Sequence, residues 1–293
     1  MTDLDARRRY FAEEIETTSN LRSAALVDAL ATIPREQFLP PGPWVIRGEA
    51  DFQSPPRQTK DADPGRLYHN VAVAIDPARM LFNGAPGLLA MAIDTLGLRQ
   101  GDRVLHLGTG PGYYTAIMAQ CVGPTGRVLG FEVDPALASA ARGNLAGTPW
   151  VDVREGGGAE PLGESFDAML INAGVTHPLA TWLDALAPGG RLLLPLTATM
   201  PAMGNIGKGL LVLVTRPGTP GTPGTWTARV VTMVAIYSAV GIRDESLNMA
   251  LGQAMQKNPF PRLQSFRRDP HEASAACWLH TNIGCFRIGP EVP

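Results

Sequence analysis

The chain has 293 residues, of which 45% are hydrophobic and 18% are charged. This composition supplies a full hydrophobic core, and the length exceeds what one domain of average size needs. The net charge of −2 and the pI of about 6.2 exclude the strongly basic surface that drives sequence-independent nucleic-acid binding. We therefore expect no nucleic-acid partner.

The N-terminal segment is charged and lacks the apolar core of a signal peptide. No uninterrupted apolar run reaches the length of a membrane span, so we expect a cytoplasmic protein with no membrane partner. Cys121, Cys277 and Cys285 are too few and too scattered for a disulfide framework, so we expect them to be reduced. Cys277 and Cys285 lie near His271 and His280, but no ligand pair has the short spacing of a metal site, so no metal is expected.

The N-terminal third predicts two helices separated by irregular chain. Residues 21–33 have an amphipathic pattern, with Leu21, Leu26 and Leu30 near one face. Residues 40–67 are rich in proline, charge and turn formers, which favours an irregular covering segment able to close over a substrate. After Pro86, apolar residues at helical spacing predict a helix up to residue 96.

A glycine-rich turn follows the next predicted strand, residues 103–107. Gly108, Gly110 and Gly112 alternate there, which permits tight turns and removes the Cβ atoms that would hold a ligand away. A second strand, residues 128–132, ends on Glu132, whose carboxylate can accept hydrogen bonds from both hydroxyls of a ribose. The two features together predict a site for a nucleoside cofactor.

The spacing of the glycines separates the cofactor classes. A dinucleotide site needs its third glycine after two intervening residues, and Tyr113 stands at that position. The motif also lacks a phosphate-binding lysine, so S-adenosylmethionine is favoured over NAD or ATP. The alternative is a tight strand-to-helix turn that binds nothing, and Glu132 at the expected distance argues against it.

The stretch 104–114 resembles the first motif of class I S-adenosylmethionine methyltransferases, and its LGTGPGY sequence is most similar to the protein L-isoaspartyl O-methyltransferases. IPREQFLP at 33–40, FDAMLINA at 166–173 and LAPGGRL at 186–192 resemble further segments of that family, in the same order. The resemblance covers residues 20–215 and implies an α/β fold: a doubly wound, mostly parallel seven-stranded-type sheet of the Rossmann-like methyltransferases. The motif, the resemblance and, for Asn172, a position at the end of a predicted strand where ligands collect in open parallel sheets indicate the following cofactor-binding residues: Gly108, Thr109, Gly110, Pro111, Gly112, Tyr113, Glu132, Val133, Gly157, Gly158 and Asn172.

The sequence departs from this family at two places. The substrate-loop signature TIS.P falls on residues 82–86, where Gly84 replaces the serine and removes its hydroxyl. In the family this loop is associated with recognition of the isoaspartyl carboxylate, so repair of isoaspartyl residues is not the expected activity. Gly157 replaces the aspartate of a GDG segment that lies near the adenosyl group in the family.

The C-terminal part predicts an α+β extension. Apolar runs at 210–214 and 228–236 predict two strands joined as a hairpin by the PGT repeat at 217–225. A helix at 244–257 and a late strand at 276–280 follow. We divide the chain into a covering segment (1–75), an S-adenosylmethionine-binding domain (76–215) and an extension (216–293).

The expected reaction is methyl transfer to a carboxylate of a peptide, a protein or a small metabolite. A carboxylate is deprotonated at neutral pH and needs no general base, and no catalytic residue is named. The candidates for acceptor contact are Tyr68, His69, Phe82 and Asn83. Some relatives with C-terminal additions methylate an aspartate of a maturing ribosomal peptide, which the resemblance adds as a specific option. The alternatives are methylation of an amine or hydroxyl on a small molecule, and a non-catalytic cofactor-binding protein.

Overall fold

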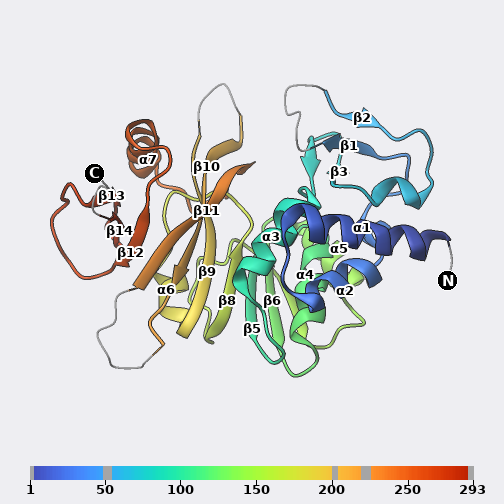
Figure 1. Cartoon of the computed structure of the whole chain (residues 1–293), viewed down its shortest axis with the longest axis horizontal. Coiled ribbons are helices and arrows are strands. Elements are labelled where there is room, and N and C mark those ends of the chain that lie inside the picture. Colours follow the sequence, from blue (N-terminus) through green and yellow to red (C-terminus); the bar gives the residue numbers. More distant parts are fainter. Residues whose placement is uncertain (1–2, 49–54, 200–203, 219–225, 290–293) are drawn as a thin grey trace. The chain divides into compact units, whose positions relative to one another are not determined.

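The computed structural model describes residues 3–48, 55–199, 204–218 and 226–289 (Figure 1). The chain forms two compact units. The first comprises Met1–Asp102 and Thr109–Glu155, and the second comprises Arg103–Gly108 and Gly156–Pro293. The chain thus passes from one unit to the other inside the glycine-rich motif. The three-part division of the sequence follows other boundaries and stays a prediction.

Helices form a large part of the first unit. They are α1 (Asp3–Ser19), α2 (Ala24–Thr32), α3 (Pro86–Leu96), α4 (Tyr113–Val122) and α5 (Pro135–Asn144), with 3-10 turns η1 (Arg35–Phe38) and η2 (Pro64–Leu67). The helices predicted at 21–33 and after Pro86 are confirmed as α2 and α3. Helix α1 was not predicted; it buries Phe11 and Ile15 and contacts α2 and α3.

Strands β6 (Arg127–Glu132) and β7 (Val151–Glu155) of the first unit pair in parallel, with Glu132 opposite Glu155. A separate antiparallel sheet has the order β2-β1-β3-β4, from β1 (Val45–Gly48), β2 (Arg57–Gln58), β3 (Val71–Asp76) and β4 (Leu81–Phe82). The prediction that 40–67 is irregular is therefore wrong for β1, β2 and η2. Trp44, Ile46, Leu67 and Val73 form the apolar cluster that orders this segment.

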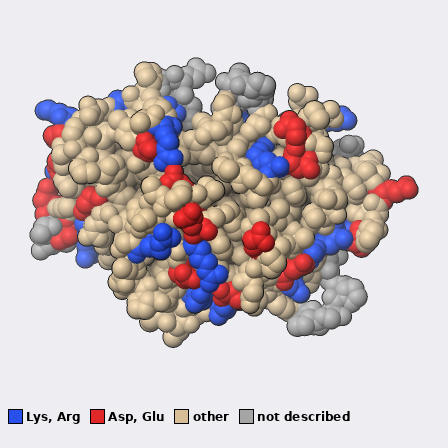
Figure 2. Space-filling model, turned by 180° about the vertical axis from the view of Figure 1, so that it is seen from behind, with Lys and Arg blue, Asp and Glu red and all other residues tan. Residues whose placement is uncertain are grey.

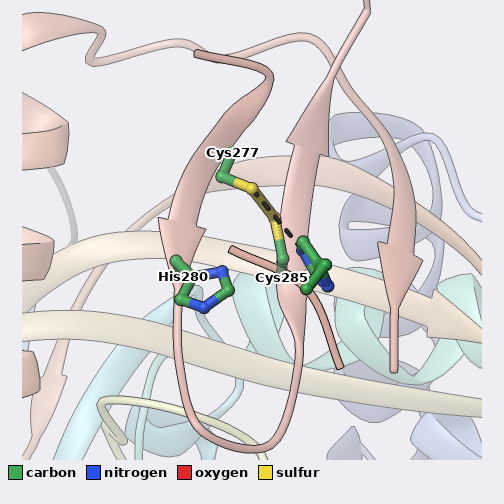
Figure 3. Close-up of side chains that lie close together, drawn as sticks. Cys277, His280 and Cys285 are labelled. Atoms are coloured by element: carbon green, nitrogen blue, oxygen red, sulfur yellow. Dashed lines mark hydrogen bonds between the residues drawn. A yellow bond between two sulfur atoms is a disulfide. The ribbon is translucent and has the colours of Figure 1, made fainter. Parts of the chain in front are cut away.

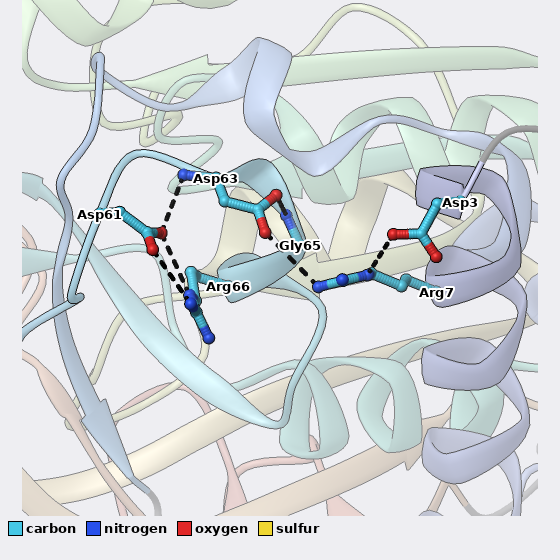
Figure 4. Close-up of polar contacts among 6 residues, drawn as sticks. All are labelled: Asp3, Arg7, Asp61, Asp63, Gly65 and Arg66. Atoms are coloured by element: carbon cyan, nitrogen blue, oxygen red, sulfur yellow. Dashed lines mark hydrogen bonds and ion pairs between the residues drawn. The ribbon is translucent and has the colours of Figure 1, made fainter.

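Charged side chains also attach this segment to α1 (Figure 4). Arg7 contacts Asp3 at 3.0 Å and Asp63 at 3.5 Å, and Asp63 in turn caps η2 by accepting from Gly65 N at 2.9 Å. Arg66 forms two bonds to Asp61, at 3.1 and 3.0 Å. Exposed pairs contribute about 0–1 kcal/mol each, so they fix the orientation of the segment more than they stabilise the fold.

The second unit is built on a mixed sheet with the strand order β13-β14-β12-β11-β10-β9-β8-β5. Its strands are β5 (Arg103–Leu107), β8 (Phe166–Ile171), β9 (Leu186–Thr199), β10 (Ile206–Thr215), β11 (Trp226–Tyr237), β12 (Leu263–Arg267), β13 (Cys277–His280) and β14 (Cys285–Ile288). Strands β5, β8 and β9 are parallel, and all later pairings are antiparallel. Helix α6 (Ala180–Ala185) and helix α7 (Glu245–Lys257) both contact β9.

These elements confirm the predicted α/β class and its parallel core. The hairpin of β10 and β11, helix α7 and strand β13 are also confirmed. The PGT repeat lies mostly outside the described residues, at 219–225. The C-terminal strands continue the sheet from β9 onward, so the extension adds strands to the parallel core of its unit.

Cys277 and Cys285 form a disulfide with a Cα–Cα distance of 5.9 Å, whereas Cys121 is free and buried. The prediction of reduced cysteines is therefore wrong for this pair. The two cysteines are eight positions apart in the sequence, on either side of the turn between β13 and β14, and antiparallel pairing of those strands brings the sulfurs together.

Lys and Arg are interspersed with Asp and Glu on the face shown in Figure 2, as the small net charge predicts. Over the described part of the chain, no helix has the length and apolarity needed to cross a bilayer.

Candidate cofactor site

The glycine-rich turn has the backbone conformation that its sequence predicts. Gly108, Gly110 and Gly112 have φ angles of +81°, +54° and +101°, a region that side chains with a Cβ rarely adopt. Gly112 caps helix α4, so the turn ends where the first free N–H groups of that helix begin. Such a turn is suited to a ligand that approaches the backbone closely.

Glu132 closes this turn from the end of β6. Its Oε2 accepts a hydrogen bond from Gly110 N at 2.7 Å, and its Oε1 accepts one from Asp134 N at 3.0 Å. The side chain is only 7% exposed. Each carboxylate oxygen has two lone pairs, so two backbone bonds leave capacity for two more donors. The residue expected to bind ribose hydroxyls therefore also connects the loops that follow β5 and β6.

The three glycines differ in the space around them. A Cβ on Gly112 would lie 2.9 Å from Leu145 Cδ1, and a Cβ on Gly108 would lie 3.0 Å from the Asn172 carbonyl oxygen. At Gly110 the nearest atom among the described residues is Ile75 Cδ1, at 3.8 Å. Gly108 and Gly112 are thus needed for packing, whereas a Cβ on Gly110 would make only an ordinary van der Waals contact with the described residues.

Thr109 and Pro111 are held by backbone contacts. Thr109 is buried, donates its N–H to Phe131 O at 3.2 Å and packs over Gly130, where an added Cβ would meet its Cγ2 at 2.6 Å. The Pro111 carbonyl accepts a bond from Asn144 Nδ2 at 2.9 Å. These contacts fix the turn without using a cofactor.

Tyr113 and Val133 have opposite environments. The Tyr113 ring is buried against Phe38, with centroids 5.6 Å apart, and burial raises the pKa of its hydroxyl. Val133 is 46% exposed. The Tyr113 side chain therefore belongs to the core, and its backbone N–H is the part of the residue that stands at the turn.

The remaining predicted cofactor residues lie in the second unit. Asn172 follows β8; its N–H donates to Leu107 O at 2.8 Å and its Nδ2 donates to Gly108 O at 3.3 Å. Gly158 O accepts a bond from Trp182 Nε1 at 2.7 Å. Among the described residues, a Cβ on Gly157 would have only Val240 O within 4 Å, at 3.8 Å. Asn172 thus holds the first glycine of the motif.

Most of the predicted acceptor residues are engaged within the first unit. Tyr68 is buried, accepts from Arg8 Nε at 3.0 Å and donates to Glu36 Oε2 at 2.5 Å. Burial, followed by the bond to Glu36, raises the pKa of Tyr68 to about 12. The buried Phe82 ring faces the Arg47 guanidinium at 5.1 Å. Tyr68 and Phe82 therefore organise this region from within.

Asn83 and His69 complete the predicted set. Asn83 Oδ1 accepts from Val73 N at 3.0 Å, which attaches the loop to β3. The side chain of His69 is exposed. Among the four candidates, His69 has the side chain most accessible to an acceptor.

Arg35 is the organising residue to which the sequence assigned no role. It is fully buried, and its guanidinium donates to Leu67 O and Val71 O, each at 2.7 Å. It also reaches the His69 carbonyl, at 3.3 Å. Arg35 lies within the IPRE segment that carries part of the family resemblance. The sequence therefore marked this residue as part of a family motif but gave no physical reason for it.

The conformation of the loop at residues 82–86 suits glycine at position 84. Gly84 has a φ of +81°, and a Cβ there would lie 2.9 Å from Leu89 Cδ2. Its carbonyl accepts a hydrogen bond from the Tyr114 hydroxyl at 3.3 Å, and helix α3 begins two residues later. A serine would be strained in this conformation.

Comparison with known proteins identifies the family. The family model for protein-L-isoaspartate(D-aspartate) O-methyltransferase matches residues 59–208, about half of the chain. A protein-L-isoaspartate O-methyltransferase of Methylorubrum extorquens is 32% identical over 218 residues, which cover 73% of this chain and 81% of that protein. The chain belongs to this family.

Further comparisons agree with this assignment. A relative with the same name from Methanopyrus kandleri is 30% identical over 193 residues, covering 64% of this chain and 76% of that protein. A solved protein-L-isoaspartate O-methyltransferase structure superposes with a TM-score of 0.61 at 22% identity, covering 89% of this chain and 72% of that chain. A Plasmodium falciparum structure described by the same enzyme name, in complex with S-adenosyl-L-homocysteine, gives a TM-score of 0.57 at 16% identity, covering 79% of this chain and 97% of that one. Both show the shared fold.

The predictions of family, enzyme class and cofactor are confirmed: the protein is an S-adenosylmethionine-dependent methyltransferase. The family match ends at residue 208, within β10. The antiparallel strands from β11 onward therefore lie outside the matched segment.

Proposed function

We propose that this enzyme methylates a carboxylate of a peptide or protein, with S-adenosylmethionine bound at the turn between β5 and α4. The observation that carries the proposal is the buried Glu132, which holds Gly110, the least crowded of the three glycines in the turn. The fit is chemical: a buried carboxylate with free lone pairs suits a ribose diol, and a turn with three glycines suits a close backbone approach.

In this proposal the protein contributes binding and position. Glu132 accepts hydrogen bonds from the ribose hydroxyls. Gly110 leaves room for the adenosyl group because it has no Cβ. The further cofactor contacts inferred from the sequence are Gly108, Thr109, Pro111, Gly112, Tyr113, Val133, Gly157, Gly158 and Asn172. The bound sulfonium supplies an activated methyl group. Correct positioning of the two reactants can lower the activation barrier of such a displacement by about 7–11 kcal/mol.

The acceptor is proposed to be an aspartyl side chain, and the specific candidate is an aspartate of a maturing ribosomal peptide. The carboxylate oxygen attacks the methyl carbon, the carbon–sulfur bonding pair stays on sulfur, and a methyl ester forms. The acceptor is already ionised at neutral pH, so no general base is required. The left-handed Gly84 supports an acceptor other than the isoaspartyl group, because this loop has no side chain at the position of the family serine.

The test has two stages. Calorimetric titration with S-adenosylmethionine is expected to give saturable binding, with NAD as the negative control. Matched peptides containing aspartate, isoaspartate or asparagine at one position are then incubated with methyl-labelled cofactor. Base-labile label on the aspartyl peptide supports the proposal. Label on the isoaspartyl peptide alone contradicts the proposed acceptor, and absence of cofactor binding contradicts the site.

A further inference from the structure

Four candidate metal ligands meet in the C-terminal part of the second unit. Cys277 and His280 lie on β13, Cys285 lies on β14, and His271 precedes them in the chain. One ligand atom from each residue lies within 4.8 Å of all the others. The strand register places His280 opposite Cys285, and Figure 3 shows these two side chains beside Cys277 on the hairpin.

His271 has the hydrogen bond that prepares a histidine for metal binding. Its Nδ1 lies 2.7 Å from the Asp269 carbonyl oxygen. A carbonyl oxygen only accepts, so Nδ1 carries the proton and Nε2 keeps its lone pair. Nε2 faces Cys277 Sγ at 3.7 Å. Metal-bound histidines commonly donate their second nitrogen to a carbonyl in this way.

His280 provides the second, independent observation. Its Nδ1 is buried and has no hydrogen-bond partner among the described residues. Its ring is perpendicular to that of His271, at 88° with centroids 4.9 Å apart. Buried polar atoms in folded proteins nearly always have a partner, so this nitrogen indicates a group that the protein atoms do not supply.

The distances and the ligand types fit zinc. Zn–S bonds near 2.3 Å and Zn–N bonds near 2.0–2.1 Å in a tetrahedral site give a sulfur–nitrogen separation of about 3.6 Å. The observed separation of Cys277 Sγ and His271 Nε2 is 3.7 Å. Two thiolates and two imidazoles are a ligand set of structural zinc sites. Cys285 is buried and the other three residues are half-buried, which suits a structural site.

We propose that His271, Cys277, His280 and Cys285 form a zinc site when the two cysteines are reduced, and that the disulfide is the alternative, metal-free state of the same residues. A dithiol reductant gives two electrons and two protons to the disulfide, yielding two thiols and its own disulfide. Zn²⁺ then displaces the two thiol protons. This proposal goes beyond the methyl-transfer function and replaces the sequence-based expectation of no metal.

The disulfide and the metal exclude each other, because metal ligation needs both sulfurs as thiolates. Either state connects β13 to β14, but only the zinc state also holds His271 and His280. The site would therefore attach the segment before β13 to the end of the sheet under reducing conditions.

The test uses the full chain with Cys121→Ser, so that every remaining thiol belongs to the cluster. The protein is treated with dithiothreitol or left oxidised, desalted without oxygen, and titrated with Zn²⁺; bound metal is measured by elemental analysis. The reduced protein is expected to bind one equivalent and the oxidised protein none. Absence of saturable binding to the reduced protein overturns the proposal.

Histidine variants assign the ligands. His271→Asn and His280→Asn are each expected to weaken zinc binding by at least the roughly 10- to 100-fold that loss of an outer-shell partner causes, because each removes a direct ligand, whereas His177→Asn, outside the cluster, leaves it unchanged. Counting free thiols after oxidation shows whether each variant still forms the Cys277–Cys285 disulfide, and hence whether the hairpin is intact. Unchanged affinity in both cluster variants contradicts the assigned ligand set. The comparison of reduced with oxidised protein does not depend on these variants.

Discussion

The decisive perturbation of the cofactor site is Glu132→Gln. The wild-type carboxylate accepts two backbone hydrogen bonds, at 2.7 and 3.0 Å, and glutamine can accept only one of them. Its amide NH₂ would oppose the other N–H. Since a hydrogen bond to a charged group contributes about 1.5–3 kcal/mol, we expect a loss of that size in the free energy of unfolding.

The same substitution is expected to weaken S-adenosylmethionine binding roughly 10- to 100-fold, equivalent to about 1.4–2.8 kcal/mol. The reason is that a neutral amide replaces an acceptor of charge-assisted bonds from the ribose. The matched control is Glu155→Gln, because Glu155 is exposed and stands opposite Glu132 in the register of β6 and β7. The control should change neither the free energy of unfolding nor the affinity for S-adenosylmethionine.

Urea unfolding measures the stability, and calorimetry below the unfolding transition measures cofactor affinity on folded protein. If Glu132→Gln loses stability but binds the cofactor as the wild type does, Glu132 only connects two loops through its backbone hydrogen bonds. That result would refute its assignment to the ribose.

Four other substitutions test separate parts of the structure. Gly110→Ala should lower cofactor affinity more than tenfold with a stability loss of about 1 kcal/mol, whereas Gly112→Ala should mainly destabilise the fold by meeting Leu145; calorimetry and urea unfolding must show this contrast. Gly84→Ser should cost about 1–2 kcal/mol in urea unfolding, and an unchanged midpoint would contradict the left-handed conformation. Burial lowers the pKa of His106 to about 3, so folding excludes its proton and stability falls as the pH drops from 6.5 towards 3. Between pH 7 and pH 5 the wild type should lose about 2 kcal/mol more than His106→Leu, and equal losses in the two proteins would contradict this burial effect.

The parallel core could be predicted because its local signals agree with one another. The strands around Leu107 and Glu132 are apolar runs that end at glycine or at a carboxylate, and helix α3 has regular apolar spacing. Helix α1 gave a weaker signal, because Phe11 and Ile15 are the only large apolar side chains that it buries. The two-residue strands of the small sheet are too short for any periodicity to develop.

The parts of the site that the sequence did not reveal depend on contacts between distant segments. Arg35 can be buried because its guanidinium donates hydrogen bonds to three carbonyl oxygens within residues 67–71. These carbonyls are more than 30 positions away in the sequence, so no local sequence pattern predicts the contact. The cysteine pair was misjudged for a similar reason, since only the pairing of β13 with β14 makes Cys277 and Cys285 neighbours.

Arg35 also explains why the predicted acceptor residues form one region although few of them are exposed. Its guanidinium fixes the backbone from Leu67 to Val71, and the Tyr68 hydroxyl is hydrogen-bonded to Arg8 and Glu36. A buried charge bound to several carbonyl oxygens is costly to displace, so this segment keeps one conformation. Tyr68 therefore helps to fix the backbone that carries the exposed His69. Acceptor specificity is accordingly expected to depend on the shape of this backbone and of the Gly84 loop more than on any single side chain.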